Sequence, residues 1–255
     1  MSNNYQVPVL EKTFRIIEKI SLHKEGISFM EIVNSLEESK TTVFRILSTL
    51  EKQNWIEKKS GFYHLGYMFI HYGLQTLTKR NLRTVAHPVM QELTNNVQQT
   101  SHIAILAGKS SMLLDVCESS RHIKPSSDIG SLLPLNCTSH GKVLLAFAIE
   151  DSLENFLKNI PLERKTEHTL TTIAELQQDI GKIRSRGYAL DDLEYFEDVR
   201  CIAAPVWGMD GLCIGALGIT ATASTFPRDK IKAYGTIITD YAKRISLQLG
   251  GVSYH

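Results

Sequence analysis

The fold is decided by residues 27–65, which read ISFMEIVNSLEESKTTVFRILSTLEKQNWIEKKSGFYHL. Apolar residues recur here at the i, i+3, i+4, i+7 spacing of an amphipathic helix, first over residues 29–36 and again over about 39–53. Ser28 followed by Glu31 predicts a capping box at the start of the first helix. Because only a few residues separate the two helices, the pattern is typical of a helix-turn-helix.

Elements on both sides extend this motif to a winged helix-turn-helix. An apolar stripe over residues 9–22 predicts a helix in front of it. Behind it, the pair at 60–61, Ser-Gly, predicts a tight turn between two short strands, which is where a wing belongs. Residues 67–82 form a further helical pattern, and a helix at this place commonly serves as a linker and dimer contact.

The rest of the chain predicts a second domain of mixed helices and strands. Strand patterns occur at 101–107, 111–116, 188–193, 199–206 and 212–220, and helical patterns at 85–96, 139–148, 153–157, 173–186 and 227–249. Pro88 is placed in the first turn of its predicted helix, where proline is tolerated. We therefore expect a DNA-binding domain over 1–66, a linker and dimerisation helix over 67–82, and an effector-binding domain over 83–255.

Composition limits the class of protein without identifying a function. The 255 residues suit two domains. Lys and Arg number 28 and Asp and Glu 27, and within residues 1–66 the counts are nine and eight. The overall charge therefore gives no evidence for nucleic-acid binding, and that prediction rests on the arrangement of the helices.

Cysteine usage and the N-terminus point to a cytoplasmic protein. Four cysteines occur without a CxxC pair or zinc-finger spacing, which predicts reduced thiols and no metal or other cofactor. The first ten residues lack the features of a signal peptide. No apolar run reaches the roughly 18 residues that a membrane span needs.

The second helix of the motif carries a polar face suited to DNA. Its apolar residues are predicted to point inward, and Ser39 is its expected N-cap. Hydroxyls and cations on the opposite face would enter the major groove, where they can meet phosphates and base edges. The predicted DNA-binding residues are Ser28, Ser39, Lys40, Thr41, Thr42, Phe44, Arg45 and Thr49, with Lys58, Lys59 and Ser60 on the wing. A solvated helix face is the alternative interpretation, and the ordered helix, turn, helix and wing argue against it.

Several stretches in order resemble the IclR family of bacterial transcription regulators over about residues 7–250. The stretches are SKTTVFRIL (39–47), YHLG (63–66), LPL (133–135), SHGKVLLA (139–146), GYALDD (187–192) and RCIAAPV (200–206). The resemblance implies an α+β protein with a winged helix-turn-helix, a linker helix and a GAF-like α/β effector domain containing an antiparallel sheet. It also implies a homodimer, or a dimer of dimers, on a palindromic operator, and repression or activation of catabolic genes.

The same resemblance implies an effector pocket. By motif position it would involve Leu133, Ser139, His140, Asp191, Val199, Cys201, Gly218 and Thr220. The chain departs from the common pattern at Asn136, where many members carry His, and at Gly218 and Thr220, where some carry serines. Leu193 also interrupts an acidic run. These departures bear on which effector binds, and a pocket is expected all the same.

Physical reasoning adds a chemical class for this effector. Thr138 or Ser139 is expected to cap a helix whose first turn Gly141 keeps open, and the unpaired amides there suit a carboxylate. Val199 and Ile202 are among the expected apolar lining. The site suits a small, anionic metabolite with polar substituents, and the resemblance implies a keto acid, sugar acid or aromatic acid. We expect this effector to control a repressor of a catabolic operon.

Several roles and one other class of function stay open. Cys201 could be core, the pair at 191–192 could be a solvated turn, and His140 could be a surface residue. Lys142 either helps to hold an anion or is exposed. Cys201, His140 and Asp191 are also the residue types of a thiol hydrolase, although no catalytic motif accompanies them. A DNA-binding protein without a ligand is the third possibility.

Overall fold

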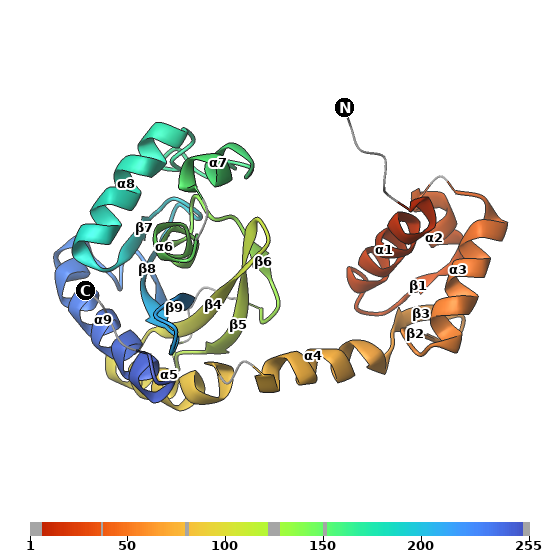
Figure 1. Ribbon diagram of the computed structural model, residues 1–255, viewed down its shortest axis with the longest axis horizontal. Coiled ribbons are helices and arrows are strands. Elements are labelled where there is room, and N and C mark those ends of the chain that lie inside the picture. Colours follow the sequence, from red (N-terminus) through yellow and green to blue (C-terminus); the bar gives the residue numbers. More distant parts are fainter. Residues whose placement is uncertain (1–6, 37, 80–81, 122–127, 150–151, 252–255) are drawn as a thin grey trace. The chain divides into compact units, whose positions relative to one another are not determined.

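The predicted helix-turn-helix is present in the computed structural model, which describes residues 7–36, 38–79, 82–121, 128–149 and 152–251. Its three helices are α1 (Pro8–Ser21), α2 (Phe29–Leu36) and α3 (Lys40–Lys52) (Figure 1). Their apolar faces meet in one core, to which Ile16, Ile32 and Leu47 contribute fully buried side chains. The helical spacing of apolar residues in the sequence is therefore the spacing of the core contacts.

A three-stranded sheet forms the wing. Its strands are β1 (Ile27–Ser28), β2 (Ile56–Lys59) and β3 (Phe62–Leu65), in the order β1-β3-β2. Ser60 and Gly61 have φ of 50° and 91°, so both central residues of the turn lie in the left-handed region. A two-residue turn of this kind matches the twist of the strands that it joins.

The helix after the wing, α4 (Tyr67–Lys79), is held by one aromatic residue. Trp55 stacks on Tyr72 with ring centroids 5.5 Å apart and meets Phe69 edge to face at 5.0 Å. At Gly66 a Cβ would lie 2.2 Å from the Asn54 carbonyl oxygen, so the chain can enter α4 here only as glycine. The first of the chain's two compact units runs from Met1 to Arg80 and the second from Asn81 to His255.

The second unit is built on a six-stranded antiparallel sheet. The strand order is β6-β5-β4-β9-β8-β7, and each neighbouring pair is antiparallel. The strands are β4 (Thr100–Ala107), β5 (Ser110–Cys117), β6 (Leu132–Leu133), β7 (Ala189–Asp192), β8 (Val199–Trp207) and β9 (Cys213–Thr222). The predicted α+β architecture, with an antiparallel sheet in the second domain, is confirmed.

Helices cover both faces of this sheet (Figure 1). One pair packs against β4, β5, β8 and β9, and a second pair packs together over the other face. The first pair is α5 (Leu82–Val97) and α9 (Ile231–Gln248), and the second is α6 (Ser139–Phe147) and α8 (Ile173–Arg186). The short helices α7 (Leu153–Lys158) and η1 (Arg228–Lys230) complete the unit.

Small residues on the sheet allow α6 to pack closely. Ala189, Ala203 and Ala216 lie in one buried cluster with Val143 and Leu144 of α6. Ala189 pairs with Ala203 across β7 and β8. These small side chains leave room for the helix, and Asp191 and Cys201 lie two residues from Ala189 and Ala203 on the same face of the sheet.

The structure corrects some of the predicted elements. The two-residue strands β1 and β6 were not expected, because a strand of that length leaves no alternation in the sequence. Helix α5 begins at Leu82, three residues earlier than predicted, so Pro88 lies inside it rather than in its first turn. Leu82 is buried, and α5 includes it although Pro88 cannot donate a backbone hydrogen bond within the helix. Among the described residues, no helix is long and apolar enough to cross a membrane.

Candidate functional site

The outward face of α3 presents cations and hydroxyls. Lys40, Thr41, Arg45 and Thr49 are exposed, as is Phe44, which exposes 59% of its surface. Val43 and the other apolar residues of α3 are buried on the opposite side. The N-terminal half of α3 therefore carries the side chains that such a helix uses in a DNA groove.

Some of the hydroxyls predicted for DNA binding have partners within the chain. Ser39 is the N-cap of α3, and its Oγ accepts the Thr42 N–H at 3.2 Å and lies 2.9 Å from Thr42 Oγ1. Thr49 Oγ1 donates to the Arg45 carbonyl. Ser28 forms the predicted capping box, since its Oγ donates to Glu31 Oε2 at 2.6 Å and accepts the Glu31 N–H.

The wing carries the other predicted contacts. Lys58, Lys59 and Ser60 are exposed at the end of the β2–β3 hairpin. Lys59 Nζ forms an ion pair with Glu57 at 2.5 Å, and Lys58 Nζ lies 5.2 Å from the centre of the Tyr63 ring. Both ammonium groups stand at the surface, where phosphate contacts can replace these exposed interactions.

A cavity of about 220 Å³ lies in the second unit beside the start of α6. It is lined by His102, Leu113, Asp128, Ser131, Leu133, Thr138, Ser139, His140, Asp191, Tyr195, Phe196, Val199, Cys201 and Thr220. Seven residues of the predicted pocket are among them. The space is many times what one water molecule needs, so it can hold a small metabolite.

Strand register explains how the polar residues of this cavity come together. Asp191 pairs with Cys201, and Cys201 pairs with Thr220. Directly paired residues share a face of the sheet, so these three form one polar row across β7, β8 and β9. Ile202, expected in the lining, is fully buried and absent from it, because neighbouring residues of a strand point to opposite faces.

Two predicted pocket residues, Gly218 and Gly141, act as supports outside the lining. A Cβ on Gly218 would lie 2.4 Å from His102 Nε2, so glycine makes room for an imidazole that does line the cavity. A Cβ on Gly141 would lie 2.6 Å from the Leu135 Cα. Gly141 therefore allows the start of α6 to approach the segment before it.

Two neutral imidazoles face each other in the cavity. His102 and His140 meet edge to face with ring centroids 5.2 Å apart. Burial lowers the pKa of His102 to about 4, and burial together with His102 lowers the pKa of His140 well below its usual value. Both rings are therefore uncharged at neutral pH.

The start of α6 resolves which residue caps this helix. Thr138 is the N-cap, and its Oγ1 accepts the Gly141 N–H at 3.2 Å. The N–H groups of Ser139 and His140 belong to the first turn and have no partner within the helix. Among the described residues, Ser139 Oγ and His102 Nε2 are buried without a hydrogen-bond partner.

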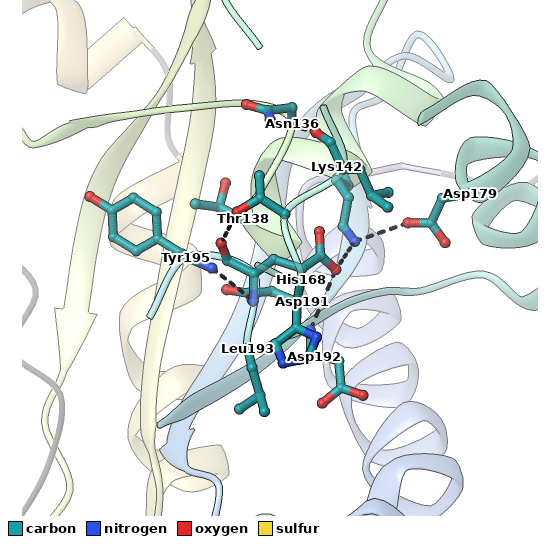
Figure 2. A network of polar contacts seen from close by, with 12 residues as sticks. Asn136, Thr138, Lys142, His168, Asp179, Asp191, Asp192, Leu193 and Tyr195 are labelled. Atoms are coloured by element: carbon teal, nitrogen blue, oxygen red, sulfur yellow. Dashed lines mark hydrogen bonds and ion pairs between the residues drawn. The ribbon is translucent and has the colours of Figure 1, made fainter. Parts of the chain in front are cut away.

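Asp191 is buried and held by the loop that follows β7. Its Oδ1 accepts the N–H of Glu194 at 2.8 Å and that of Tyr195 at 3.3 Å (Figure 2). Burial raises the pKa of Asp191 to about 7, with a contribution from the Glu194 carboxylate. The solvated-turn interpretation of Asp191 is therefore wrong.

A buried ion cluster stands behind this loop (Figure 2). Lys142 Nζ lies 2.6 Å from Glu194 Oε1 and 2.9 Å from Asp179 Oδ2, and the lysine side chain is 1% exposed. Burial alone would lower the pKa of Lys142, but the two carboxylates outweigh it and the pKa is raised. Both earlier interpretations of Lys142, an anion ligand and an exposed residue, are thus wrong.

The sequence missed seven lining residues, namely His102, Leu113, Asp128, Ser131, Thr138, Tyr195 and Phe196. His102 and Leu113 belong to predicted strands, and alternation would have shown which of their neighbours share a face. Thr138 was recognised as a possible cap. No pattern in the sequence marks Asp128 or Phe196, because loops place them.

Comparisons with known proteins agree with this architecture. The family model for the bacterial transcriptional regulator IclR C-terminal domain matches residues 74–247, and the model for the IclR helix-turn-helix domain matches residues 9–60. The chain is 30% identical to the HTH-type transcriptional regulator KdgR of Escherichia coli, over 96% of this chain and 92% of that protein. It is 25% identical to the transcriptional repressor IclR of the same species, over 97% and 92%.

Solved structures show the same fold. The IclR structure of Thermotoga maritima superimposes with a TM-score of 0.75 at 29% identity, covering 96% of this chain and all of that one. An IclR homologue from Microbacterium hydrocarbonoxydans, complexed with 4-hydroxybenzoate, superimposes with a TM-score of 0.82 at 20% identity, covering 94% and 98%. The two family models together span most of the chain, which therefore belongs to the IclR family of bacterial transcriptional regulators.

Proposed function

We propose that this transcriptional regulator binds a palindromic operator through α3 and the wing, and that a small carboxylate metabolite in the α6 cavity controls its operator affinity. The observation that carries the proposal is the cavity itself, where the unpaired start of α6 meets polar side chains from four strands. A carboxylate is favoured at a helix N-terminus by the amides and by the helix dipole. Relatives named as repressors support repression, here of a catabolic operon.

The DNA half of the proposal assigns roles along α3. Lys40, Thr41 and Arg45 are the exposed polar residues nearest the helix start, which is the end that contacts base edges in this class of motif. The hydroxyls of Ser28, Ser39 and Thr42 serve mainly to cap their helices. Lys58 and Lys59 of the wing are assigned to phosphates.

A homodimer belongs to the proposal, because a palindrome presents two equal half-sites. Helix α1 exposes Val9, Leu10 and Phe14, with Phe14 at 66%. Exposed apolar side chains that gather on one helix are typical of an interaction surface. A second copy of the chain is the partner that fits.

The hydrolase alternative is not favoured by the geometry. A thiol nucleophile needs a depressed pKa and a base that takes its proton. Burial and the neighbouring Asp191 instead raise the pKa of Cys201 well above its usual value. The Cys201 thiol contacts Thr220 Oγ1 at 3.2 Å, while His140 Nδ1 contacts Thr138 Oγ1.

The DNA half can be tested with one substitution and a matched control. An operator is first selected from a random DNA pool with the purified protein. Arg45→Ala should then cost about 1–3 kcal/mol of operator binding free energy, measured by fluorescence anisotropy at fixed salt. Lys52→Ala removes an exposed cation from the far end of the same helix and should leave the affinity nearly unchanged. Equal losses in the two variants would contradict the assigned reading face.

The effector half is tested on the same complex. A carboxylate that binds the cavity should raise the melting temperature of the protein and change its operator affinity. A ligand-independent DNA-binding protein would show neither effect with any acid tried.

A further inference from the structure

A second cavity, of about 230 Å³, lies in the second unit beside the end of β8, whereas the α6 cavity lies beside the start of that strand. Its lining comes from the ends of α6 and α8, from β8 and from α9. No residue lines both cavities, so the two are separate sites. Neither the operator nor the proposed effector makes use of the second one.

This cavity lies at an open stretch of the sheet edge. β7 begins at Ala189, which pairs with Ala203, so residues 204–207 of β8 extend beyond it. In the described part of the chain, this stretch has a neighbouring strand on one side only, namely β9. Pro205 lies in it, and a proline, which has no N–H to donate, is tolerated at such an edge. The cavity therefore lies beside a strand that is not covered by a neighbour.

Aromatic and small residues form the floor of the second cavity. Phe147 and Trp207 meet edge to face, with ring centroids 5.5 Å apart and an interplanar angle of 71°. Pro205 beside them is buried, and Gly187, with a φ of 80°, contributes no side chain. Aromatic rings pack on the faces and edges of other rings. The floor therefore favours a flat aromatic group.

A guanidinium group at the rim is oriented without being neutralised. Arg184 Nε donates to the Ala146 carbonyl at 2.8 Å, which fixes the plane of the group near the end of α6. Its two Nη groups have no partner among the described residues. Lys243, also at the rim, is exposed and forms no ion pair with any of them. An oriented guanidinium of this kind suits a carboxylate, which it can bind with two hydrogen bonds.

The rim also carries groups that suit a cation. Asp240 is exposed and has no ion-pair partner in the described part of the chain. The end of α8 at Gly187 adds the partial negative charge of a helix C-terminus. Thr239 Oγ1 donates to the Gly235 carbonyl at 2.8 Å, so its oxygen can still accept a hydrogen bond. An ammonium group can interact favourably with all three.

We propose that the second cavity binds a free aromatic α-amino acid, with its ring on the Phe147–Trp207 pair, its carboxylate at Arg184 and its ammonium group at Asp240. An aromatic acid would place an anion near Asp240, and an aromatic amine would place a cation near Arg184. An aliphatic amino acid would pair both charges but leave the aromatic floor without a ring. Only a zwitterion with an aromatic side chain matches the whole lining. The site goes beyond the proposed function and does not depend on it.

The chain contains two tryptophans, so fluorine NMR can observe this site directly. Full-length protein labelled with 5-fluorotryptophan gives one signal for Trp55 and one for Trp207, which the Trp55→Phe variant assigns. At least one of L-phenylalanine, L-tyrosine and L-tryptophan should shift the Trp207 signal saturably.

Three matched ligands each lack one part of the amino acid. They are 3-phenylpropanoate without the ammonium group, 2-phenylethylamine without the carboxylate, and L-leucine without the aromatic ring. The best aromatic amino acid should bind about tenfold or more tightly than each of them, because each lost charged hydrogen bond or ring contact is worth about that factor.

Two variants test the two charged ends. Arg184→Met should weaken the best amino acid about tenfold and should not weaken 2-phenylethylamine, which has no carboxylate. Asp240→Asn should weaken the amino acid and should not weaken 3-phenylpropanoate. Lys182→Met removes an exposed cation of α8 outside the lining and is the control that should change nothing. Since Asp240 has no partner among the described residues, D240N still tests the site if R184M does not fold.

Each other outcome overturns the proposal. Binding of 3-phenylpropanoate as tight as that of the best amino acid would refute the ammonium end, and equally tight 2-phenylethylamine would refute the carboxylate end. Equal binding of L-leucine would refute the aromatic class. A Trp207 shift that Thr220→Val abolishes would place the ligand in the α6 cavity instead. If none of the three aromatic amino acids shifts the signal, the second site is refuted, while operator and effector binding remain to be judged by their own measurements.

Discussion

At the scale of single residues, the pocket depends on charges that burial controls. Asp191 is 1% exposed and its pKa is raised to about 7, whereas His102 is held neutral with a pKa of about 4. Both shifts have the same first cause, since burial penalises the charged form of an acid and of a base alike. Burial therefore keeps His102 uncharged and leaves Asp191 about half protonated at pH 7.

Asp191 makes stability depend on pH in a defined direction. Its folded pKa of about 7 exceeds the unfolded value of about 3.9, so the folded state binds more protons between these values. The stabilisation from this acid is complete below about pH 4 and is lost as pH rises through about 7. Asp191→Asn removes the titration and keeps an oxygen that can accept from Glu194 and Tyr195.

The melting temperature of D191N relative to wild type should therefore increase from pH 5 to pH 8.5. Glu194, Lys142 and Cys201 lie near Asp191 in both proteins, so the difference reports the loss of this carboxyl group together with its effect on the Glu194 carboxylate. Scanning calorimetry across the pH series measures it. A difference that stays constant with pH would show that Asp191 does not titrate in this range.

At the scale of elements, one lysine joins three segments of the second unit. Lys142 of α6 binds Asp179 of α8 and Glu194 of the loop after β7. The same loop is anchored by Thr166 and Thr169, whose hydroxyls donate to the Leu193 and Glu194 carbonyls. Lys142 of α6 therefore helps to position the loop that holds Asp191.

Lys142→Met should lower the free energy of unfolding of the second unit by about 3–5 kcal/mol, because it leaves two buried carboxylates without their cation. Urea unfolding followed by circular dichroism measures the loss. Lys182→Met on the exposed face of α8 is the control and should change stability by less than about 0.5 kcal/mol.

The double variant K142M/E194Q tests the cause of that loss. If the unpaired charge is responsible, removing the Glu194 charge as well should recover part of the stability. A double variant that is less stable than K142M would instead attribute the loss to packing.

The boundaries of the helices and strands show which parts of the secondary structure can be predicted from the sequence pattern. Helices α1, α2 and α3 were predicted within about a residue, because each has an apolar stripe and because Ser28 and Ser39 cap α2 and α3. Pro88 misled the prediction of α5, since the sequence shows the missing N–H but not the burial of Leu82. Strand β6 has two residues and depends on its pairing with β5.

At the scale of the whole molecule, the proposed function couples two separate units through binding free energy. If an effector lowers the operator affinity by a given factor, the operator must lower the effector affinity by the same factor. Coupling of this kind commonly amounts to about 5- to 150-fold. The two affinities can be measured independently on the full-length chain.

We expect an acid that binds the α6 cavity to lose at least fivefold in affinity when the operator is saturating, with an equal loss of operator affinity when the acid is saturating. Calorimetry measures the first and anisotropy the second. Arg45→Ala, at a DNA concentration too low for this weakened variant to bind the operator, should show the same acid affinity with and without DNA. Identical affinities in all conditions for the wild type would contradict effector control.

The sequence by itself determined the class of this protein. Local patterns suffice for the winged helix-turn-helix, because helical periodicity, caps and a two-residue turn each depend on residues close in the chain. Motif order was enough to predict the family, the antiparallel second domain and seven residues that line its cavity.

Only the tertiary structure decided which residues line that cavity and which of them carry a charge. Strand register brings Asp191, Cys201 and Thr220 into one row, and loops add Asp128 and Phe196. Burial then decides charge, holding the imidazoles neutral and pairing Lys142 behind the site instead of within it. The pocket's chemistry is a property of contacts between residues far apart in the chain, and local sequence patterns do not encode such contacts.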